Sequence, residues 1–240
     1  MSVNSTILNR AKKVAAKEAL SFIHSKMIIG LGTGSTAEVF VELLAKKFFS
    51  EKLDIQVLST SSLTEKQAKS LGLPLTKITD VSRIDIVVDG ADETDMNLNL
   101  IKGGGGALLQ EKIVASNSEK MVVIVDSSKV VTRLGKFPLP IEIVKFGSNH
   151  TKKKIENILY DLGYSNFNMN WRKYNKNYFV TDEKHFILDL SLKKITDPHI
   201  LDMNIKKIVG VVETGLFINM ANLVIIGNND GSFKLIEQKG

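Results

Sequence analysis

The sequence predicts an α/β protein, and three features of its 240 residues point to that class. Apolar runs with the length of buried strands alternate with amphipathic segments of helical periodicity, which is the pattern of βαβ units around a parallel sheet. The rhythm changes after Pro138 and Pro140, which indicates a second, smaller unit. The hydrophobic fraction of 43% and the charged fraction of 24% are ordinary for a globular chain that can bury such cores.

The first half of the chain shows the alternation of strands and helices most clearly. Four apolar runs have the length of buried strands, at residues 27–31, 55–58, 84–88 and 121–125. We expect a surface helix near the N-terminus and further helices at residues 36–49 and 62–71. A capping box of Ser62 and Glu65 is predicted to open the last of these helices, and Gly72 to close it. This order predicts a Rossmann-like parallel sheet domain.

The second half of the chain follows a different order of elements. After the two prolines we expect a strand at 141–144, a helix at 152–162, a hairpin through Phe179 and 186–190, and a helix begun by Asp197 and Pro198. This order resembles a split βαβ, ferredoxin-like α+β unit. Short apolar runs in the tail are expected to form strands that rejoin the first domain, around Val211, Leu216, 223–226 and 233–236. We therefore assign residues 1–136 and 208–240 to the Rossmann-like domain and residues 137–207 to a small α+β domain.

Composition excludes several classes of protein. The chain has no cysteine, which excludes disulfides, a thiolate nucleophile and a cysteine-ligated zinc site. Its four histidines lie far apart and form no His-x-x-x-His pair, so we expect no metal. The first residues are polar and basic, and no apolar stretch is long enough for a signal peptide core or a membrane span. A cytoplasmic protein without a membrane partner is therefore expected.

The net charge of +6 comes mostly from scattered lysines. Only four of the 32 basic residues are arginines, whereas a nucleic-acid binder is expected to cluster arginine and aromatic side chains. We therefore expect solvated lysine faces and no nucleic-acid partner, although such a surface would attract an anionic metabolite. The Asn-rich segment 166–178 contains Trp171 and Arg172 and resembles an RNA-binding patch only superficially. A polar surface loop or hairpin tip is the preferred interpretation, and we assign it no function.

A glycine-rich turn joins the first predicted strand to the helix that follows, Gly30-Leu31-Gly32-Thr33-Gly34-Ser35-Thr36-Ala37. Such glycines let backbone N–H groups approach an anion. A dinucleotide fingerprint can be counted from Gly32, but the acidic residue that an NAD site needs after the second strand is replaced by hydroxyl residues at 59–62. A purely structural turn is the other alternative. The hydroxyl groups of Thr33, Ser35 and Thr36 favour a phosphate monoester, bound with Gly32 and Gly34.

Acidic residues follow the third predicted strand, in Asp89-Gly90-Ala91-Asp92-Glu93. The carboxylates of Asp89 and Asp92, which flank Gly90 and Ala91, can hydrogen-bond sugar hydroxyls and exchange protons during ring opening. Capping of a turn is one alternative. Metal ligation is the other, and it is disfavoured because no histidine accompanies the acids.

Four glycines lie between a lysine and an apolar helix, in Lys102-Gly103-Gly104-Gly105-Gly106. Their exposed amides, together with Lys102, could stabilise the oxyanion of a developing enediolate. Glu111 falls about one turn into the helix, and helical side chains lean back towards the N-terminus, so Glu111 can face the glycine loop. The alternatives are a flexible linker and an ordinary exposed glutamate, but linkers are not usually followed at once by an apolar helix.

These three motifs, in this order, resemble the ribose-5-phosphate isomerase family of the A type. The likeness extends along the chain through Thr64-Glu65-Lys66, Ser70-Leu71-Gly72, Lys136-Phe137-Pro138-Leu139-Pro140, Gly210-Val211-Val212 and Gly215-Leu216-Phe217. The resemblance implies reversible conversion of D-ribose 5-phosphate into D-ribulose 5-phosphate in the non-oxidative branch of the pentose phosphate pathway, without a cofactor or metal. It also implies a homodimer or homotetramer, with a catalytic Rossmann-like domain and an oligomer-forming small domain.

The resemblance also implies a role for individual residues. The phosphate or sugar would be held by hydroxyl residues and by two lysines, namely Thr33, Ser35, Thr36, Lys12 and Lys129. Ring opening and hydroxyl binding match Asp89 and Asp92. The oxyanion would be stabilised by Lys102 and the amides that follow it, and Glu111 would be the base that transfers the proton.

Two other functional classes share some of these features. A sugar-phosphate deaminase would share the phosphate loop but should need a histidine partnered with acids near the active site, and the sequence shows no histidine in the three motifs. A sugar-phosphate sensor without catalytic activity should carry an effector module such as a helix-turn-helix, and the sequence shows none.

Overall fold

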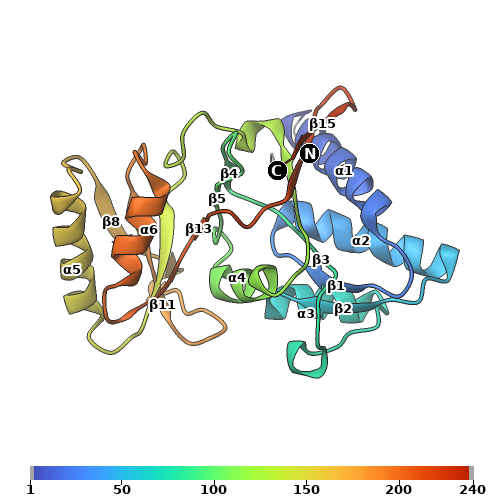
Figure 1. The fold of residues 1–240 in the computed structure, drawn as a ribbon, viewed down its shortest axis with the longest axis horizontal. Coiled ribbons are helices and arrows are strands. Elements are labelled where there is room, and N and C mark those ends of the chain that lie inside the picture. Colours follow the sequence, from blue (N-terminus) through green and yellow to red (C-terminus); the bar gives the residue numbers. More distant parts are fainter. Residues whose placement is uncertain (1–2, 238–240) are drawn as a thin grey trace.

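The computed structural model of the chain describes residues 3–237, which form two main sheets joined by a smaller one. Residues 1, 2 and 238–240, which the expected first domain includes, lie outside the described residues. Figure 1 shows the larger sheet with its helices at one end of the molecule and the four-stranded sheet at the other. The three-stranded sheet lies between them (Figure 1).

The larger sheet has six strands in the order β15-β14-β6-β3-β1-β2. Its strands are β1 (Ile28–Leu31), β2 (Gln56–Ser59), β3 (Ile86–Asp89), β6 (Met121–Asp126), β14 (Leu223–Gly227) and β15 (Phe233–Glu237). All neighbouring strands are parallel except β14 and β15, which are antiparallel. The four strands predicted in the first half of the chain are confirmed, and so is the Rossmann-like parallel sheet.

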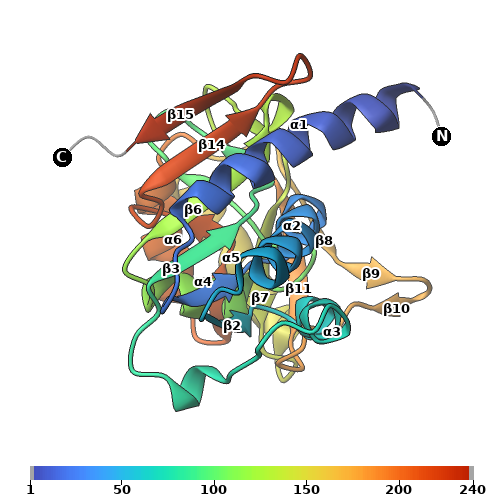
Figure 2. The same cartoon turned by 90° about the vertical axis from the view of Figure 1, so that its right-hand side faces the viewer.

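Helices cover both faces of this sheet. They are α1 (Val3–Ala19), α2 (Ser35–Glu51), α3 (Ser62–Ser70) and α4 (Leu108–Ser116), with short 3₁₀ turns η1 (Leu20–Phe22), η2 (Ile78–Asp80) and η3 (Ser127–Lys129). Figure 2 shows α1 lying across β14 and β6, with α2 beside it. Among residues 3–237, none of the helices combines the length and the apolar character that crossing a bilayer requires.

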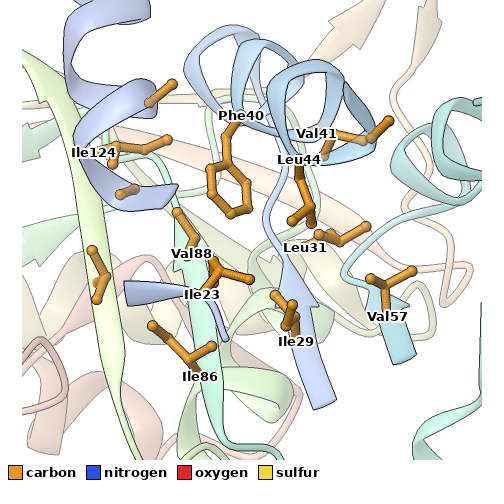
Figure 3. Close-up of a cluster of buried hydrophobic side chains, with 14 of the residues drawn as sticks. Ile23, Ile29, Leu31, Phe40, Val41, Leu44, Val57, Ile86, Val88 and Ile124 are labelled. Atoms are coloured by element: carbon orange, nitrogen blue, oxygen red, sulfur yellow. The ribbon is translucent and has the colours of Figure 1, made fainter. Parts of the chain in front are cut away.

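The core between β1 and α2 follows from the two periodicities of the sequence. Successive strand residues face opposite sides of a sheet, so Ile29 and Leu31 point to the same face, where they pack with Phe40 and Leu44 of α2 (Figure 3). All four side chains are fully buried. Gly30 faces the opposite side, where a Cβ atom would lie 2.7 Å from Val114 of α4. The glycine therefore lets α4 approach the end of β1 that carries the first glycine-rich turn.

The predicted capping box of α3 is wrong by one residue. Ser61, in extended conformation, is the N-cap, and its Oγ accepts a hydrogen bond from the Thr64 N–H at 3.1 Å. Ser62 already belongs to the helix, so its hydroxyl is not the group that caps the helix N-terminus. Its N–H and hydroxyl instead donate to Asp182 in the other half of the molecule. A run of four hydroxyl residues leaves the capping position ambiguous, and only the backbone conformation decides it.

The four-stranded sheet and its two helices confirm the predicted ferredoxin-like unit. The elements follow the chain as β7 (Leu139–Ile143), α5 (Ser148–Asp161), β8 (Asn168–Trp171), β11 (Phe186–Ser191), α6 (Pro198–Lys206) and β12 (Val211–Thr214). The strand order is β12-β7-β11-β8, all antiparallel. The exposed hairpin β9 (Lys173–Tyr174) and β10 (Asn177–Tyr178), which projects from the molecule in Figure 2, occupies the Asn-rich segment.

The run around Val211 differs from its prediction, because β12 pairs with β7 and does not rejoin the larger sheet. The physical reason is local. Val211 follows Ile208 and packs on the same buried cluster as Ile141 and Ile155, so the strand completes the small sheet. The next run, β13 (Leu216–Phe217), pairs with β5 (Leu100–Ile101), which pairs with β4 (Glu93–Thr94) in the small connecting sheet. The limits of the two domains themselves stay a prediction.

Candidate active site

The three motifs meet at one cavity of about 200 Å³ at the carboxyl ends of β1 and β3. Parallel strands end at the same edge of a sheet, which is where open α/β sheets bind ligands. The cavity is lined by Lys12, Thr33, Gly34, Ser35, Thr36, Gly90, Ala91, Asp92, Lys102, Gly103, Gly104, Gly105, Glu111, Asp126, Ser128 and Lys129. Of the predicted site residues, Gly32, Asp89 and Gly106 lie behind this lining and not in it.

One end of the cavity is the N-terminus of α2. Gly34 is the N-cap residue with φ of 108°, a conformation that favours glycine, and Ser35 and Thr36 form the first turn. The unpaired N–H groups and the dipole of a helix N-terminus attract anions. Lys12 of α1 reaches this point, since its Nζ donates to Ser35 Oγ at 2.7 Å. The predicted phosphate residues Lys12, Ser35 and Thr36 are thus brought together.

The hydroxyl of Thr33 is engaged inside the protein. Its Oγ1 lies 2.8 Å from both Thr60 Oγ1 and Ser61 Oγ, and 3.2 Å from Thr64 Oγ1. This cluster ties the first glycine-rich turn to the end of β2 and the start of α3. In the sequence analysis, the hydroxyl residues at the end of β2 served only to argue against an NAD site, because they stand where such a site needs an acidic residue. Their supporting role depends on the parallel pairing of β1 with β2.

At the other end of the cavity, Lys102 lies between two carboxylates. Its Nζ is 2.9 Å from Glu111 Oε1 and 2.9 Å from Asp89 Oδ2, and it donates to the Gly90 carbonyl at 2.6 Å. The side chains of all three ionisable residues are at most 4% exposed. Water is thus almost excluded from these charges, which strengthens their interaction.

Burial dominates the proton affinities of the two carboxyl groups. It raises the pKa of Glu111 to about 8, against the opposing effect of Lys102, and Asp89 raises it further. Burial also raises the pKa of Asp89, again against Lys102. Although burial has the opposite effect on a lysine, the pKa of Lys102 is raised because Asp89 and Glu111 stabilise its charged form. Lys102 therefore stays an ammonium, and Glu111 can exchange a proton near neutral pH.

Asp89 is fully buried and does not line the cavity, which differs from its predicted direct contact with sugar hydroxyls. Its Oδ1 accepts the N–H groups of Thr33 at 3.0 Å and of Gly90 at 2.7 Å. A Cβ atom at Gly32 would lie 2.1 Å from the same oxygen, so only glycine fits there. Asp89 is thereby placed to hold two loops and Lys102. Sequence spacing alone does not distinguish a buried carboxylate from an exposed one.

Asp92 is the acid of the second motif that does line the cavity. It is half-buried, and its Oδ2 accepts the Gly104 N–H at 2.7 Å. A side chain at Gly104 would lie 2.6 Å from Asp92 Oδ1. Asp92 thus packs against the glycine loop, while its exposed part stays available to a ligand.

The helix that carries Glu111 is anchored by its neighbour Lys112, a residue that sequence reasoning did not single out. Lys112 Nζ donates to the carbonyls of Thr214 and Leu216, each at 2.7 Å, and pairs with Glu213 Oε1 at 2.9 Å. These contacts join α4 to β12 and β13. The signal in the sequence was a lysine beside Glu111 on an otherwise apolar helix.

The last wall of the cavity follows β6, where η3 carries Ser128 and Lys129. Asp126 Oδ1 accepts the Ser128 N–H at 3.0 Å and so shapes this turn. Lys129 therefore lines the cavity, and its contact with the substrate stays a prediction. Among residues 3–237, no group of three or more His, Cys, Asp or Glu side chains is arranged to hold a metal ion.

Comparison with known proteins agrees with this geometry. The family model described as ribose 5-phosphate isomerase A (phosphoriboisomerase A) matches residues 56–231. A ribose-5-phosphate isomerase A of Dinoroseobacter shibae is 46% identical over 235 residues, which cover 98% of this chain and 90% of that protein. The structure of ribose 5-phosphate isomerase from Plasmodium falciparum has a TM-score of 0.89 at 42% identity, covering 96% of this chain and 99% of that one.

A second solved structure is that of a D-ribose-5-phosphate isomerase in complex with phospho-erythronic acid. Its TM-score is 0.87 at 38% identity, covering 96% of this chain and 99% of that one. Fold, cavity and relatives together define an isomerase. The chain belongs to the ribose-5-phosphate isomerase A family.

Proposed function

We propose that the protein interconverts D-ribose 5-phosphate and D-ribulose 5-phosphate through an enediolate, with Glu111 as the proton-transferring base. The observation that carries this proposal is the two-ended cavity. An anion site at the start of α2 faces a buried cluster of Lys102, Glu111 and Asp89 across a space that fits a small sugar phosphate.

Binding is assigned to the end of the cavity near α2. The phosphate would accept hydrogen bonds from the N–H groups and hydroxyls of Ser35 and Thr36, with Lys12 supplying a positive charge. Lys129 is a further substrate contact on the opposite wall. Thr33 supports this turn through its hydroxyl cluster. This arrangement would direct the carbon chain of the sugar towards Lys102.

Proton transfer is assigned to the buried end. Glu111 takes a proton from C2 and returns it to C1 on the same face of the enediolate, while the hydroxyl proton moves between O1 and O2. Glu111 Oε2 is assigned to this proton transfer because it has no hydrogen-bond partner among the described residues. The Lys102 ammonium and the free amides of the glycine loop stabilise the negative oxygen. Asp92 contacts a sugar hydroxyl and takes part in ring opening.

Asp89 has a supporting role in this proposal. It balances the charge of Lys102 and holds the turns at Thr33 and Gly90. A second carboxylate beside Lys102 also raises the proton affinity of Glu111. Ring opening by Asp89, which the sequence suggested, would require its side chain to leave this buried position.

We also propose that the reaction needs no cofactor or metal, since the residues described supply a base, a cation and amide donors. A homodimer or homotetramer formed through the small domain, residues 137–207, and a cytoplasmic location remain part of the proposal.

A coupled assay of ribulose 5-phosphate formation with EDTA present tests the reaction and its independence of metal together. We expect wild-type activity to be unchanged after dialysis against the chelator. Loss of activity that a divalent ion restores would contradict the metal-free mechanism. Absence of any conversion, with or without added divalent ion, would contradict the proposed reaction.

A further inference from the structure

Arg172 connects the Asn-rich segment to the glycine loop of the active site. It lies between β8 and β9, and its side chain is only 14% exposed. Its Nη1 donates to the Gly103 carbonyl at 2.6 Å and to the Gly104 carbonyl at 3.0 Å. Arg172 does not line the cavity, so it contacts the loop from behind.

The guanidinium group is held in a defined plane before it reaches the loop. Its Nε donates to Asp189 Oδ2 at 3.0 Å, and its Nη2 donates to the other oxygen of the same carboxylate. A bidentate pair of this kind fixes the orientation of both groups. The ring of Phe179 also contacts this group, since its centroid lies 6.0 Å from the guanidinium carbon of Arg172. The same ring packs against the glycine loop, because a Cβ atom at Gly106 would lie 2.4 Å from it.

Peptide geometry translates this contact into the direction of one N–H group. The Gly104 carbonyl and the Gly105 N–H belong to the same planar peptide, and in a trans peptide the two bonds point in opposite directions. Arg172 holds the carbonyl on the side away from the cavity, so the Gly105 N–H points towards the cavity that Gly105 lines. Among the described residues the Gly105 N–H has no hydrogen-bond partner, whereas the Gly104 N–H is bound by Asp92.

We propose that Arg172 is a positioning residue that aims the Gly105 N–H at the oxyanion of the reaction intermediate. Four consecutive glycines have more conformational freedom than any other sequence, so this donor needs an external restraint. A donor that is oriented before the reaction stabilises the intermediate without reorganisation at the moment of proton transfer. The inference rests on the proposed enediolate mechanism.

The variants Arg172→Ala and Arg172→Lys test this role, with Lys173→Ala as the matched control in the same hairpin. Lys173 is exposed and adjacent in sequence. We expect Arg172→Ala to lower kcat about 10- to 100-fold, because small displacements of a catalytic group have effects of this size. KM should change by less than about threefold, because the phosphate site at α2 is untouched. Arg172→Lys should resemble Arg172→Ala, since an ammonium cannot serve Asp189 and two carbonyls together.

Two further measurements separate positioning from general damage. Guanidinium ion added at low concentration should restore part of the kcat of Arg172→Ala and leave Lys173→Ala unchanged. Phospho-erythronic acid carries both a planar carboxylate and a phosphate, whereas inorganic phosphate carries only the second group. Arg172→Ala should weaken inhibition by phospho-erythronic acid by about tenfold and leave inhibition by phosphate nearly unchanged.

A wild-type kcat in Arg172→Ala, or an equal loss of both inhibitors, would overturn the inference. If thermal melting shows that Arg172→Ala does not fold, Arg172→Lys takes its place in the inhibition experiment. Inhibition of Arg172→Lys should then be weaker with phospho-erythronic acid and nearly unchanged with phosphate. An equal loss of both would overturn the inference. If wild-type protein does not isomerise the sugar phosphate, the proposed function fails. The role of Arg172 can then still be tested by measuring the direct binding of phospho-erythronic acid and of phosphate to wild type and variant.

Discussion

Lys102 Nζ lies 2.9 Å from Glu111 Oε1, and the two residues are only nine positions apart in the sequence. The glycine loop between them lets the chain turn back sharply enough for this contact, with φ of 97° at Gly103 and 85° at Gly106. The proposed base thus lies beside the cation that would stabilise its product. Both side chains are almost fully buried, so the proton affinity of Glu111 and the charge interaction of the pair differ from those of exposed residues.

Replacement of Glu111 by glutamine tests the base directly. We expect kcat to fall by about 10²-fold or more, the range found when a general base is removed. KM should change little, because an amide has the size of the carboxylate and Glu111 is not among the residues assigned to the phosphate. Steady-state kinetics in both directions measure these values.

Glu119→Gln is the matched control, since Glu119 is an exposed glutamate just beyond the same helix. It should retain wild-type kinetics. Near-normal turnover of Glu111→Gln in a folded protein would assign the base to another carboxylate, with Asp92, which lines the cavity, as the first candidate.

The pH dependence of kcat/KM should report the buried cluster. Burial raises the pKa of Glu111 to about 8, so the free enzyme loses active base as the pH falls below this value. We expect kcat/KM to rise from pH 6.5 towards pH 9 with an apparent pKa of about 8, which belongs to Glu111 and Asp89 together. The substrate phosphate titrates separately, with its second pKa near 6. A profile that is flat above pH 7 would contradict the prediction.

The same pKa shift makes stability change with pH in the opposite direction to kcat/KM. Between the ordinary pKa of Glu111, 4.5, and the folded value of about 8, the native state binds a proton that the unfolded state has lost. The free energy of unfolding therefore falls as the pH rises through this window. Glu111→Gln removes this dependence. As the pH rises from 6 to 9, the free energy of unfolding of the variant should therefore increase relative to that of wild type by on the order of 2 kcal/mol.

Urea denaturation at several pH values measures this difference, with Glu119→Gln again as the control. Parallel stability curves for wild type and Glu111→Gln would show that the Glu111 carboxyl group has an ordinary pKa in the folded protein. The kinetic and the stability experiments thus examine the same proton by independent readouts.

Thr36→Ala tests the position of the phosphate. Thr36 lines the cavity in the first turn of α2 and is not part of the buried cluster, so it should contribute similar binding to substrate and transition state. We expect KM to rise by about tenfold while kcat changes by less than about threefold. Thr132→Ala, at an exposed threonine outside this cavity, should leave both values unchanged. An unchanged KM in Thr36→Ala would place the phosphate elsewhere.

Much of the fold was predictable because the signals are local. Apolar runs of four or five residues are typical of buried strands, and β1, β2, β3 and β6 lie where they were expected. The position of Glu111 was predictable for a related reason. A glycine loop followed at once by an apolar helix places Glu111 one turn into that helix, whatever the rest of the chain does.

The limits of prediction appear where a residue's partner is distant in sequence. The β12 strand has the same apolar pattern as a strand of the larger sheet, and its pairing with β7 depends on which buried cluster it completes. Thr33 was expected to face a phosphate, but its hydroxyl is bound by residues 27 to 31 positions away. Periodicity specifies which side of an element a residue occupies, not what lies against that side.

The sequence by itself determined the parallel sheet, the order of elements from β7 to α6 in the ferredoxin-like unit, the three glycine and acidic motifs and the placement of Glu111, because these depend on the spacing of neighbouring residues. Only the tertiary structure decided that Asp89 is fully buried against Lys102 while Asp92 reaches the cavity, and that Arg172 holds the loop at Gly104 from behind. Burial raises the energy of a charge by an amount that depends on every surrounding element. That property exists only once strands and loops from distant parts of the chain have packed together.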